Sequence, residues 1–445
     1  MTEQELQRLH ALLRVPSVSA MPEHAADMET AAAMVVSEIE LAGGSAEIIR
    51  GDFKPLVVGE VPAARPDAPR VILYGHYDVQ PVGDPALWTS PAFEPVVRDG
   101  NLYCRGASDD KGNLFMLLAA VQRLAAGEGL PVHVSFIIDG EEECGGDSAV
   151  RHIQADDRPA AAAVVFDTAM VAPERPAVCS GLRGLVYRRV RVRTAPSDAH
   201  SGVYGGAGLN AAHALLAILD HIRPRDGALD PRLCVGVAAP APDEVAVWER
   251  LPAGAVALEE AGLRPADATA AAEFYVRTLA GPALDVHGLE CGEPTAVKTN
   301  LPSTAMATLS LRLAPGQDPE AMAGALDELI REAAPAGAEV TIEGHGASPP
   351  SLMDPRDPMV AAAMDAIARS TGWPCVPVRS GGTIPVGAAF TGRGIPTILS
   401  GFALPDDGIH GPDEHLRFEY LEVGTLAAME ILRALGAAAG SVGNA

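Results

Sequence analysis

Five short segments rich in acidic residues and histidine constrain this chain most, because each comes at or just after an apolar run. They are Tyr74–Asp78, Gly106–Gly112, Asp139–Glu143, Val165–Asp167 and Ile409–Pro412. Buried strands end in this way, and side chains at the ends of neighbouring strands can converge on one point. Carboxylates and imidazoles that converge near apolar surface repel one another or lose hydration unless a cation holds them. The pattern therefore predicts a cation-binding cluster, for which a pair of metal ions is the simplest occupant.

Strand patterns alternate with helical patterns in the first part of the chain and again at its end. This alternation predicts an α/β fold with a mixed, largely parallel sheet between helices. Because 445 residues exceed the usual size of one domain, two domains are expected. The α/β domain, which would carry the five segments, is expected to comprise residues 1–185 and 348–445. Helices are expected at residues 3–14, 28–39, 112–126, 358–370 and 418–435, and strands at 48–49, 56–58, 71–74, 132–138, 161–166, near 376 and at 397–399.

The pattern of apolar and polar residues between residues 186 and 347 differs from that of the α/β part of the chain. Residues 186–193 alternate apolar and basic side chains, as a half-exposed strand does. A helix is expected at 209–222 and further strands at 305–313 and 338–342. The segment therefore predicts an α+β domain, residues 186–347, inserted into the α/β domain.

Composition limits the classes of partner. The formal net charge of −25 argues against binding to nucleic acid or to an anionic membrane. No stretch reaches about 18 consecutive apolar residues, and the acidic N-terminus lacks the pattern of a signal peptide. The six cysteines form no Cys-x-x-Cys pair and are expected to be reduced thiols. We therefore expect a soluble, cytoplasmic protein.

His76 and Asp78 are two residues apart at a strand end, so their side chains point the same way. A histidine that binds metal usually donates its other N–H to a carboxylate, which fits His76 as ligand and Asp78 as the acid that orients it. Taken alone, a His-x-Asp pair of this kind is more often a capped surface turn than a metal site. Asp109, held between Gly106 and Gly112, is expected to point inward rather than into solvent.

Glu141, Glu142 and Glu143 directly follow an apolar strand, where three acids are costly unless cations compensate them. The structural alternative is an acidic helix N-terminus favoured by the helix dipole. In the metal interpretation, one glutamate binds metal while its neighbour takes a proton from water. Asp167 and His410 then supply the remaining ligands. Taken together, the five segments favour the metal interpretation.

In combination and in order, these motifs resemble the co-catalytic two-zinc exopeptidases, and the resemblance covers nearly the whole chain. That family includes carnosinase, cytosolic nonspecific dipeptidase, aminoacylase and succinyl-diaminopimelate desuccinylase. The segment Asp198–Gly206 is similar to the carnosinase and nonspecific-dipeptidase branch. The resemblance implies that Asp109 bridges two metal ions, that His76 and Asp167 complete one site, and that Glu143 and His410 complete the other. It implies further that Glu142 is the general base, that Asp78 orients His76, and that the Asp109–Asp110 peptide bond is cis.

The same resemblance makes the inserted domain a lid and dimerisation domain. Its His200 is expected to reach the active site of a partner subunit in a homodimer and to stabilise the oxyanion there. Residues at positions that match the family's substrate-binding region are Arg312, Gly382, Thr383, Lys298 and Thr299.

One departure from the branch bears on the substrate. The branch commonly has Arg-Glu-Gly-Gly-Ser, where this chain has Arg379-Ser380-Gly381-Gly382-Thr383. Ser380 lacks a carboxylate that would pair with a free α-amino group. The expected reaction is hydrolysis of dipeptides, or dipeptide-like small substrates, with a free C-terminal carboxylate; the alternative is an N-acyl-amino-acid deacylase or desuccinylase.

Glu142 beside Glu143 argues against the other class considered, a metal-binding protein without activity, because such a descendant would have lost its base. Two divalent ions per subunit are expected, with zinc favoured and manganese or cobalt as alternatives.

Overall fold

The computed structural model describes residues 1–293, 295 and 298–442. It divides into two compact units. The first comprises Met1–Ser180, Met353–Val378 and Pro385–Ala445, and the second comprises Gly181–Leu352 and Arg379–Ile384. The inserted region of the sequence thus forms a compact unit, which six residues from the C-terminal part of the chain join.

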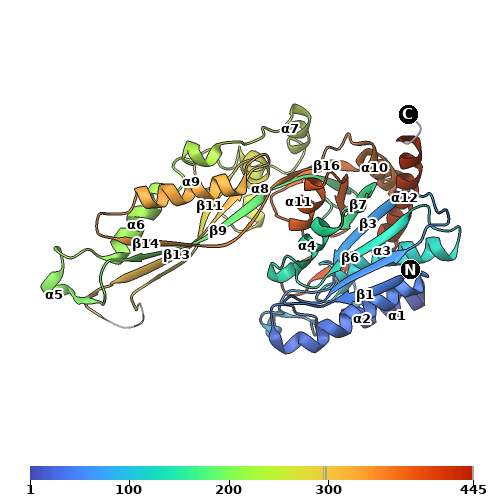
Figure 1. The fold of residues 1–445 in the computed structure, drawn as a ribbon, viewed down its shortest axis with the longest axis horizontal. Coiled ribbons are helices and arrows are strands. Elements are labelled where there is room, and N and C mark those ends of the chain that lie inside the picture. The colour runs from blue at the N-terminus through green and yellow to red at the C-terminus, as the bar shows by residue number, and fades with distance from the viewer. Residues whose placement is uncertain (294, 296–297, 443–445) are drawn as a thin grey trace. The chain divides into compact units, whose positions relative to one another are not determined.

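The first unit is built on a six-stranded sheet with the order β1-β2-β6-β3-β7-β17. Figure 1 labels β1, β6, β3 and β7 of this sheet. Neighbouring strands from β6 to β17 run parallel, whereas β1 and β2 pair antiparallel at one edge. The mixed, largely parallel sheet expected from the sequence is therefore confirmed. The strands are β1 (Ser45–Ile49), β2 (Leu56–Val61), β3 (Arg70–His76), β6 (His133–Asp139), β7 (Ala162–Phe166) and β17 (Thr397–Ser400).

Helices cover this sheet because its central strands are apolar on both faces. Val71 and Leu73 of β3 share one hydrophobic cluster with α3, whereas Ile72 and Tyr74 are equally buried but point to the opposite face. The helix α3 packs against β3, α1, α2 and α12, while α4 packs against β6 and α11 packs against β17. The helices of this unit are α1 (Glu3–Leu13), α2 (Ala25–Leu41), α3 (Lys111–Ala126), α4 (Ser148–Ala155), α10 (Pro358–Thr371), α11 (Pro385–Gly392) and α12 (Tyr420–Val442).

The last helix, α12, is long and apolar enough to cross a membrane by length and composition alone. One side of it belongs to the core of the first unit, where it packs against α10 and α3. Ile431 and Leu435 on that side are fully buried. Packing within the unit therefore accounts for the apolar residues on that side.

The second unit is an antiparallel four-stranded sheet with the order β11-β13-β9-β14. Helices α6 and α9 pack on it, and their apolar residues form its core with Val190, Leu309 and Leu311. Its elements are β9 (Gly184–Arg193), β10 (Ala199–His200), α5 (Ser201–Tyr204), α6 (Ala211–Ile222), α7 (Pro242–Trp248), α8 (Gly254–Glu260), β11 (Ala283–Cys291), β12 (Asn300–Leu301), β13 (Thr304–Leu313), α9 (Pro319–Glu332) and β14 (Glu339–Ser348).

Among the described residues, three small sheets accompany the two larger ones, and the smallest is the antiparallel pair β10-β12. Strands β4 (Val96–Arg98), β5 (Asn101–Tyr103) and β18 (His415–Arg417) form the second, and β8 (Ala177–Leu182), β15 (Ser351–Leu352) and β16 (Val376–Ser380) form the third. The pairing of β18 with β5 matters for the site, because it brings the segment after His410 beside the segment before Asp109.

Candidate metal centre

Three parallel strands deliver acidic and imidazole side chains to one edge of the large sheet. His76 is the last residue of β3, Asp167 directly follows β7, and Glu142 and Glu143 lie three and four residues after β6. Because the carboxyl ends of parallel strands meet at the same edge, these side chains converge there.

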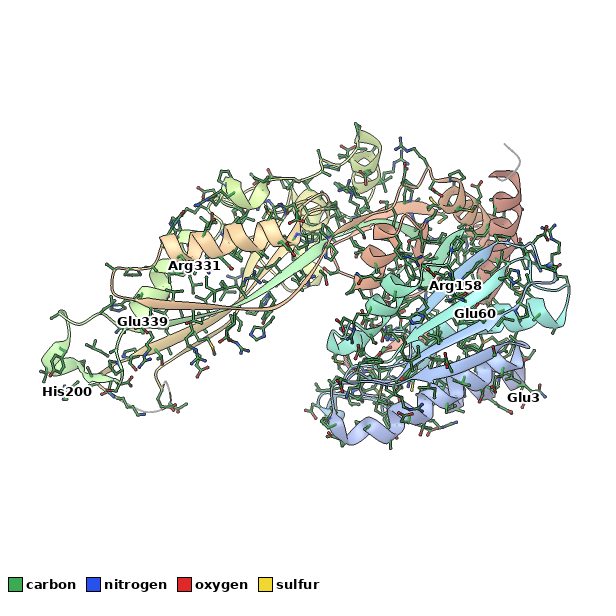
Figure 2. The ribbon with its side chains drawn as sticks, in the orientation of Figure 1. Glu3, Glu60, Arg158, His200, Arg331 and Glu339 are labelled. Carbon is green, nitrogen blue, oxygen red and sulfur yellow. The ribbon has the colours of Figure 1, made fainter. Side chains whose placement is uncertain are left out.

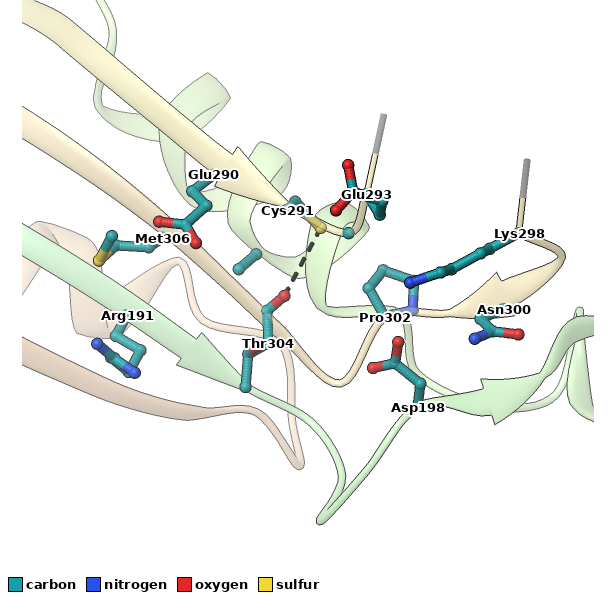
Figure 3. Close-up of a pocket in the computed structure, with 12 residues that line it drawn as sticks. Arg191, Asp198, Glu290, Cys291, Glu293, Lys298, Asn300, Pro302, Thr304 and Met306 are labelled. Carbon is teal, nitrogen blue, oxygen red and sulfur yellow. Dashed lines mark hydrogen bonds between the residues drawn. The ribbon is translucent and has the colours of Figure 1, made fainter. Parts of the chain in front are cut away.

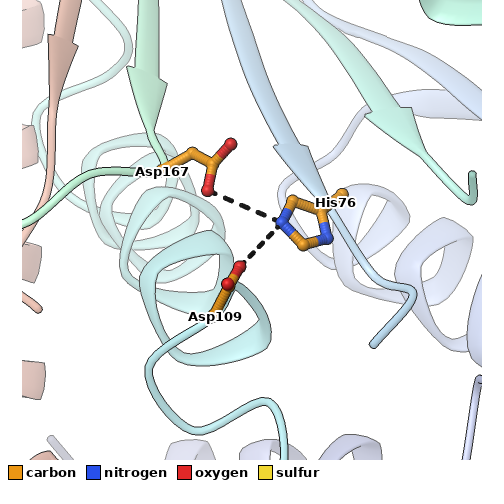
Figure 4. Close-up of side chains that lie close together, drawn as sticks. All are labelled: His76, Asp109 and Asp167. Carbon is orange, nitrogen blue, oxygen red and sulfur yellow. Dashed lines mark hydrogen bonds and ion pairs between the residues drawn. The ribbon is translucent and has the colours of Figure 1, made fainter. Parts of the chain in front are cut away.

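The converging side chains form two groups that share Asp109. In the first, Nε2 of His76 lies 3.0 Å from Oδ1 of Asp109 and 3.6 Å from Oδ1 of Asp167 (Figure 4). In the second, Nε2 of His410 lies 2.9 Å from Oδ2 of Asp109 and 3.2 Å from Oε2 of Glu143. Within each group the three ligand atoms lie within 4.8 Å of one another. The structure thus brings together all five residues expected to bind metal.

The donor atoms fit a pair of divalent ions. Each group offers one imidazole nitrogen and carboxylate oxygens, a mixture that zinc accepts and that other first-row metals also accept. The Asp109 carboxylate faces one group with each oxygen, as a bridging ligand would.

Burial and neighbouring charges shift the protonation of these groups. Burial raises the pKa of Asp167 to about 6. Burial also opposes the charge of Asp109, but hydrogen bonds from His410 and His76 hold the pKa of that carboxyl below its usual range. Hydrogen bonds to Asp109 and Glu143 raise the pKa of His410 to about 10. The carboxylates therefore favour positive charge at the same places where two metal ions would lie.

The other side of the His76 ring faces Asp78. Nδ1 of His76 lies 3.1 Å from the main-chain oxygen of Asp78 and 3.4 Å from its Oδ1. Oδ2 of Asp78 accepts the backbone N–H of Glu143 at 3.1 Å. The fully buried Asp78 therefore contacts one residue from each group.

Asp110 plays a different part from its neighbour Asp109. The peptide bond between them is cis, as the resemblance implied. Oδ2 of Asp110 accepts the backbone N–H of His76 at 3.1 Å. A β-carbon on Gly75 would lie 2.8 Å from that oxygen, so only glycine fits beside it.

The three consecutive glutamates separate into three environments. Glu141 is structural, since its carboxylate accepts the backbone N–H groups of Ser148 and Lys54. Glu143 belongs to the second ligand group. Glu142 belongs to neither group, and burial raises its pKa to about 9, with the Asp167 and Glu143 carboxylates adding to the shift. A carboxyl group that holds a proton this readily beside the ligands suits proton transfer.

In the second unit, the structure brings Arg312 and Thr383 together. Nη1 of Arg312 donates to the Thr383 hydroxyl at 2.9 Å, and that hydroxyl donates to the main-chain oxygen of Arg183 at 2.6 Å. Thr383 therefore orients Arg312. Gly382 lies in the same turn, where its N–H donates to Oγ of Ser380.

Two arginines share this part of the second unit. Burial and the nearby Arg312 guanidinium lower the pKa of Arg183 to about 10. Over residues 1–293, 295 and 298–442, neither Arg183 nor Arg312 forms an ion pair with a carboxylate. Asp285 lies near enough to act on Arg183 electrostatically but forms no ion pair with it in the described part of the chain. Two half-buried guanidinium groups that lack a direct carboxylate partner suit an anionic ligand.

His200 lies at the exposed end of the second unit, on β10 beside α5 (Figure 2). Its Nδ1 accepts the N–H of Gly202 at 3.0 Å, which leaves Nε2 directed away from this turn. His200 belongs to neither ligand group.

Thr299 and Lys298 lie close to this strand. The main-chain oxygen of Thr299 accepts the N–H and the hydroxyl of Ser201 at 2.9 and 2.6 Å. Lys298 lines a pocket of about 370 Å³ together with Asp198, Glu290 and Arg191 (Figure 3).

Two charged residues beside the centre were not expected from the sequence. Glu414 is 0% exposed and Arg105 is 1% exposed, and the two side chains form an ion pair with each other. Glu414 also accepts the backbone N–H of Asp109. The sequence signal that could have indicated Glu414 is its position, four residues after His410 in a segment with few apolar residues.

Two ligand groups that share one carboxylate, with a further carboxyl group beside them, define the centre of a co-catalytic two-metal hydrolase. The sequence profile of peptidase family M20/M25/M40 matches residues 72–434. The chain therefore belongs to this family, and it is a metal-dependent hydrolase of peptide bonds.

Individual relatives agree with this assignment. The chain is 32% identical to the cysteinylglycine-S-conjugate dipeptidase of Corynebacterium striatum, over 98% of this chain and 96% of that protein. It is 27% identical to the human β-Ala-His dipeptidase, over 83% of this chain and 75% of that protein. An M20 family metallo-carboxypeptidase from Sulfolobus solfataricus has a similar structure, with a TM-score of 0.87 and 25% identity over 98% of this chain and 100% of that chain.

Proposed function

We propose that this protein hydrolyses the amide bond of dipeptides, or dipeptide-like small substrates, that carry a free C-terminal carboxylate. The observation that carries the proposal is the pair of ligand groups joined by Asp109, with Glu142 beside them but outside both. When bound, two divalent ions supply Lewis acidity and lower the pKa of water at the site. Zinc is the metal we favour, with manganese and cobalt as alternatives.

Glu142 is the residue we assign to proton transfer. It takes a proton from the attacking water and later gives one to the leaving amine, because the same carboxyl group serves as base and then as acid. Its raised pKa comes from burial and from the neighbouring Asp167 and Glu143, and bound cations would lower it again. His76, held on its far side by Asp78, keeps a fixed ring orientation during the reaction.

The second unit supplies the groups that select the substrate. Arg312, oriented by Thr383, holds the C-terminal carboxylate with charge-assisted hydrogen bonds. Gly382, Lys298 and Thr299 are assigned to the same substrate-binding region. His200 stabilises the oxyanion in the active site of a partner subunit, so the working form is a homodimer. The acidic composition and the reduced cysteines expected from the sequence favour the cytoplasm as its location.

The relatives named above support small peptides as the substrate class, since two are dipeptidases and one is a carboxypeptidase. Ser380 favours a second candidate, an N-acyl-amino-acid deacylase or desuccinylase. Its hydroxyl accepts the N–H of Gly382 and brings no negative charge to pair with an α-amino group.

Metal analysis tests the proposal. The purified protein should contain about two divalent ions per chain, one for each ligand group. Exhaustive chelation should abolish hydrolysis of a dipeptide panel, and zinc, manganese or cobalt should restore it to different extents. Full activity after complete removal of metal would overturn the two-metal mechanism. Comparison of each dipeptide with its N-acetylated form decides between the two substrate classes.

A further inference from the structure

The segment that carries Asp109 is held in place by one buried carboxylate from a distant part of the chain. Oε1 of Glu414 accepts the backbone N–H groups of Gly106, Ser108 and Asp109 at 3.1, 3.0 and 3.1 Å. Glu414 is 0% exposed. Three N–H groups directed at one oxygen fix the path of the main chain that leads into Asp109.

The other oxygen of Glu414 forms an ion pair with Arg105. Nη2 of Arg105 donates to the main-chain oxygens of Gly411 and Pro81 at 3.1 and 3.3 Å. Gly411 directly follows His410. The Glu414–Arg105 pair therefore joins the segment that carries Asp109 to the segment that carries His410.

A second set of bonds joins the same two segments. The Ser108 hydroxyl donates to Oδ2 of Asp407 at 2.9 Å, and that oxygen also accepts the N–H of Leu404 at 2.8 Å. Nδ2 of Asn113 donates to the main-chain oxygen of Ser108 at 2.7 Å, while its Oδ1 accepts the N–H of Phe402 at 3.0 Å. Residues 402–414 are thus bonded to residues 105–113 at several points.

We propose that Glu414 is a positioning residue for the metal pair, which it serves by fixing Asp109 through its backbone. The inference rests on the two-metal mechanism proposed above and adds a residue that contacts neither substrate nor metal. Because Asp109 faces both ligand groups, a shift of its main chain moves a ligand of both sites at once. A change at Glu414 should therefore lower the affinity for both ions, whereas a change at His410 should lower the affinity only for the ion that His410 binds.

The test compares Glu414→Asp and Glu414→Gln with the wild-type protein. Aspartate keeps the charge beside Arg105 but draws the carboxylate back by one methylene, away from the three N–H groups. Glutamine keeps the length and one acceptor oxygen but loses the charge. The measurement is zinc affinity at each site, by competition with a chromophoric chelator, together with the thermal stability of the metal-free protein.

Glu5 provides a matched control in the same unit. It is 7% exposed, and Arg123 donates to both of its carboxylate oxygens at 2.8 Å. Glu5→Asp and Glu5→Gln therefore make the same changes at a buried, arginine-paired carboxylate that contacts neither ligand group.

Glu414→Asp should lower the affinity for both ions by about 10- to 100-fold, the range typical of residues that support metal ligands. Glu414→Gln should retain more affinity than Glu414→Asp. The two Glu5 variants should lose stability but keep wild-type affinity, and His410→Ala should retain one tightly bound ion. Wild-type affinity at both sites in a folded Glu414→Asp protein would overturn the positioning role, as would an equal loss of affinity in Glu5→Asp. A wild-type protein that binds no metal would refute the proposed function instead.

Discussion

Oδ1 of Asp78 lies 3.4 Å from Nδ1 of His76, and both side chains are fully buried. The carboxylate of Asp78 also accepts the N–H of Glu143 through its other oxygen. One acid that binds no metal therefore supports a ligand in each group. Such an acid fixes the orientation of an imidazole and strengthens it as a ligand.

Asp78→Asn should reduce metal affinity by about 10- to 100-fold, because the amide no longer carries the charge that faces His76. Titration of the metal-free protein with zinc measures the change. Asp156→Asn is a suitable control, since Asp156 is a half-buried partner of Arg70 that belongs to neither ligand group. Equal zinc affinities for the Asp78 variant and the wild type would mean that Asp78 does not support the metal ligands.

Glu142→Gln should leave the metal content largely intact, because Glu142 lies outside both ligand groups. The turnover number should fall by at least about 100-fold, since a positioned general base is worth that much or more. Parallel measurement of metal content and turnover for Glu142→Gln and Glu143→Gln separates base from ligand. If the Glu142 variant lost metal while the Glu143 variant kept its turnover, the two roles would be reversed.

The sequence predicts the first unit well because its signals are local. Apolar runs such as Val71–Tyr74 end at the acidic and histidine segments, and the parallel sheet then forces those segments to one edge. In the second unit, β11 escapes prediction because it lacks regular alternation and its pairing with β13 shifts between Val286 and Gly288. The helix α9 carries a readable pattern in Met322, Leu326 and Ile330, yet it was not among the expected elements.

The parts of the site that the sequence does not reveal depend on contacts across long chain separations. The hydrogen bonds from residues 106–109 to Glu414 join segments about 300 residues apart, and no local sequence pattern predicts them. The left-handed backbone conformation of His410, with φ of 63°, is not predicted by the sequence either, since only glycine adopts that region freely. The division of Glu141, Glu142 and Glu143 among three environments also follows from tertiary structure.

Stability should decrease in acid through the Glu5–Arg123–Glu422 network. Hydrogen bonds from Arg123 lower the pKa of both Glu5 and Glu422 to about 2, from an ordinary value of 4.5. A lowered carboxyl pKa contributes stability above the unfolded-state value, and this is lost as pH falls from about 4.5 toward 2. Glu5→Gln should therefore cost about 1–2 kcal/mol of unfolding free energy at pH 7. This is less than the full pKa shift implies, because Arg123 is partly exposed and keeps its pair with Glu422.

Denaturant unfolding of wild type and Glu5→Gln at several pH values measures this contribution. The difference in unfolding free energy should be constant above about pH 5 and should shrink as the pH falls below it. A difference that stayed constant down to pH 3 would mean that the ion pairs do not set the stability of this region.

His200 should act across a homodimer. His200→Ala should reduce turnover by about 100- to 1,000-fold, the value of one oxyanion donor, without loss of metal. A mixture of inactive His200→Ala and Glu142→Gln subunits should recover part of the activity after subunit exchange, because one hybrid site then has both residues. His213, on α6 of the same unit, provides a control histidine. Full activity of a strictly monomeric preparation would count decisively against the cross-subunit role.

The two ends of the substrate should contribute unequally to binding. Amidation of the C-terminus should cost about 2 kcal/mol or more in kcat/KM, because Arg312 would then lack its anionic partner. Acetylation of the amino end should cost much less, since Ser380 offers no charge there. Thr383→Val should raise KM for the free acid, because Arg312 loses the hydroxyl that orients it. The same substitution should reduce the difference in kcat/KM between the free acid and the amide. Thr383→Ser keeps the hydroxyl and should behave like the wild type. If C-terminal amides were hydrolysed as well as free acids, Arg312 and Thr383 would bind some other part of the substrate.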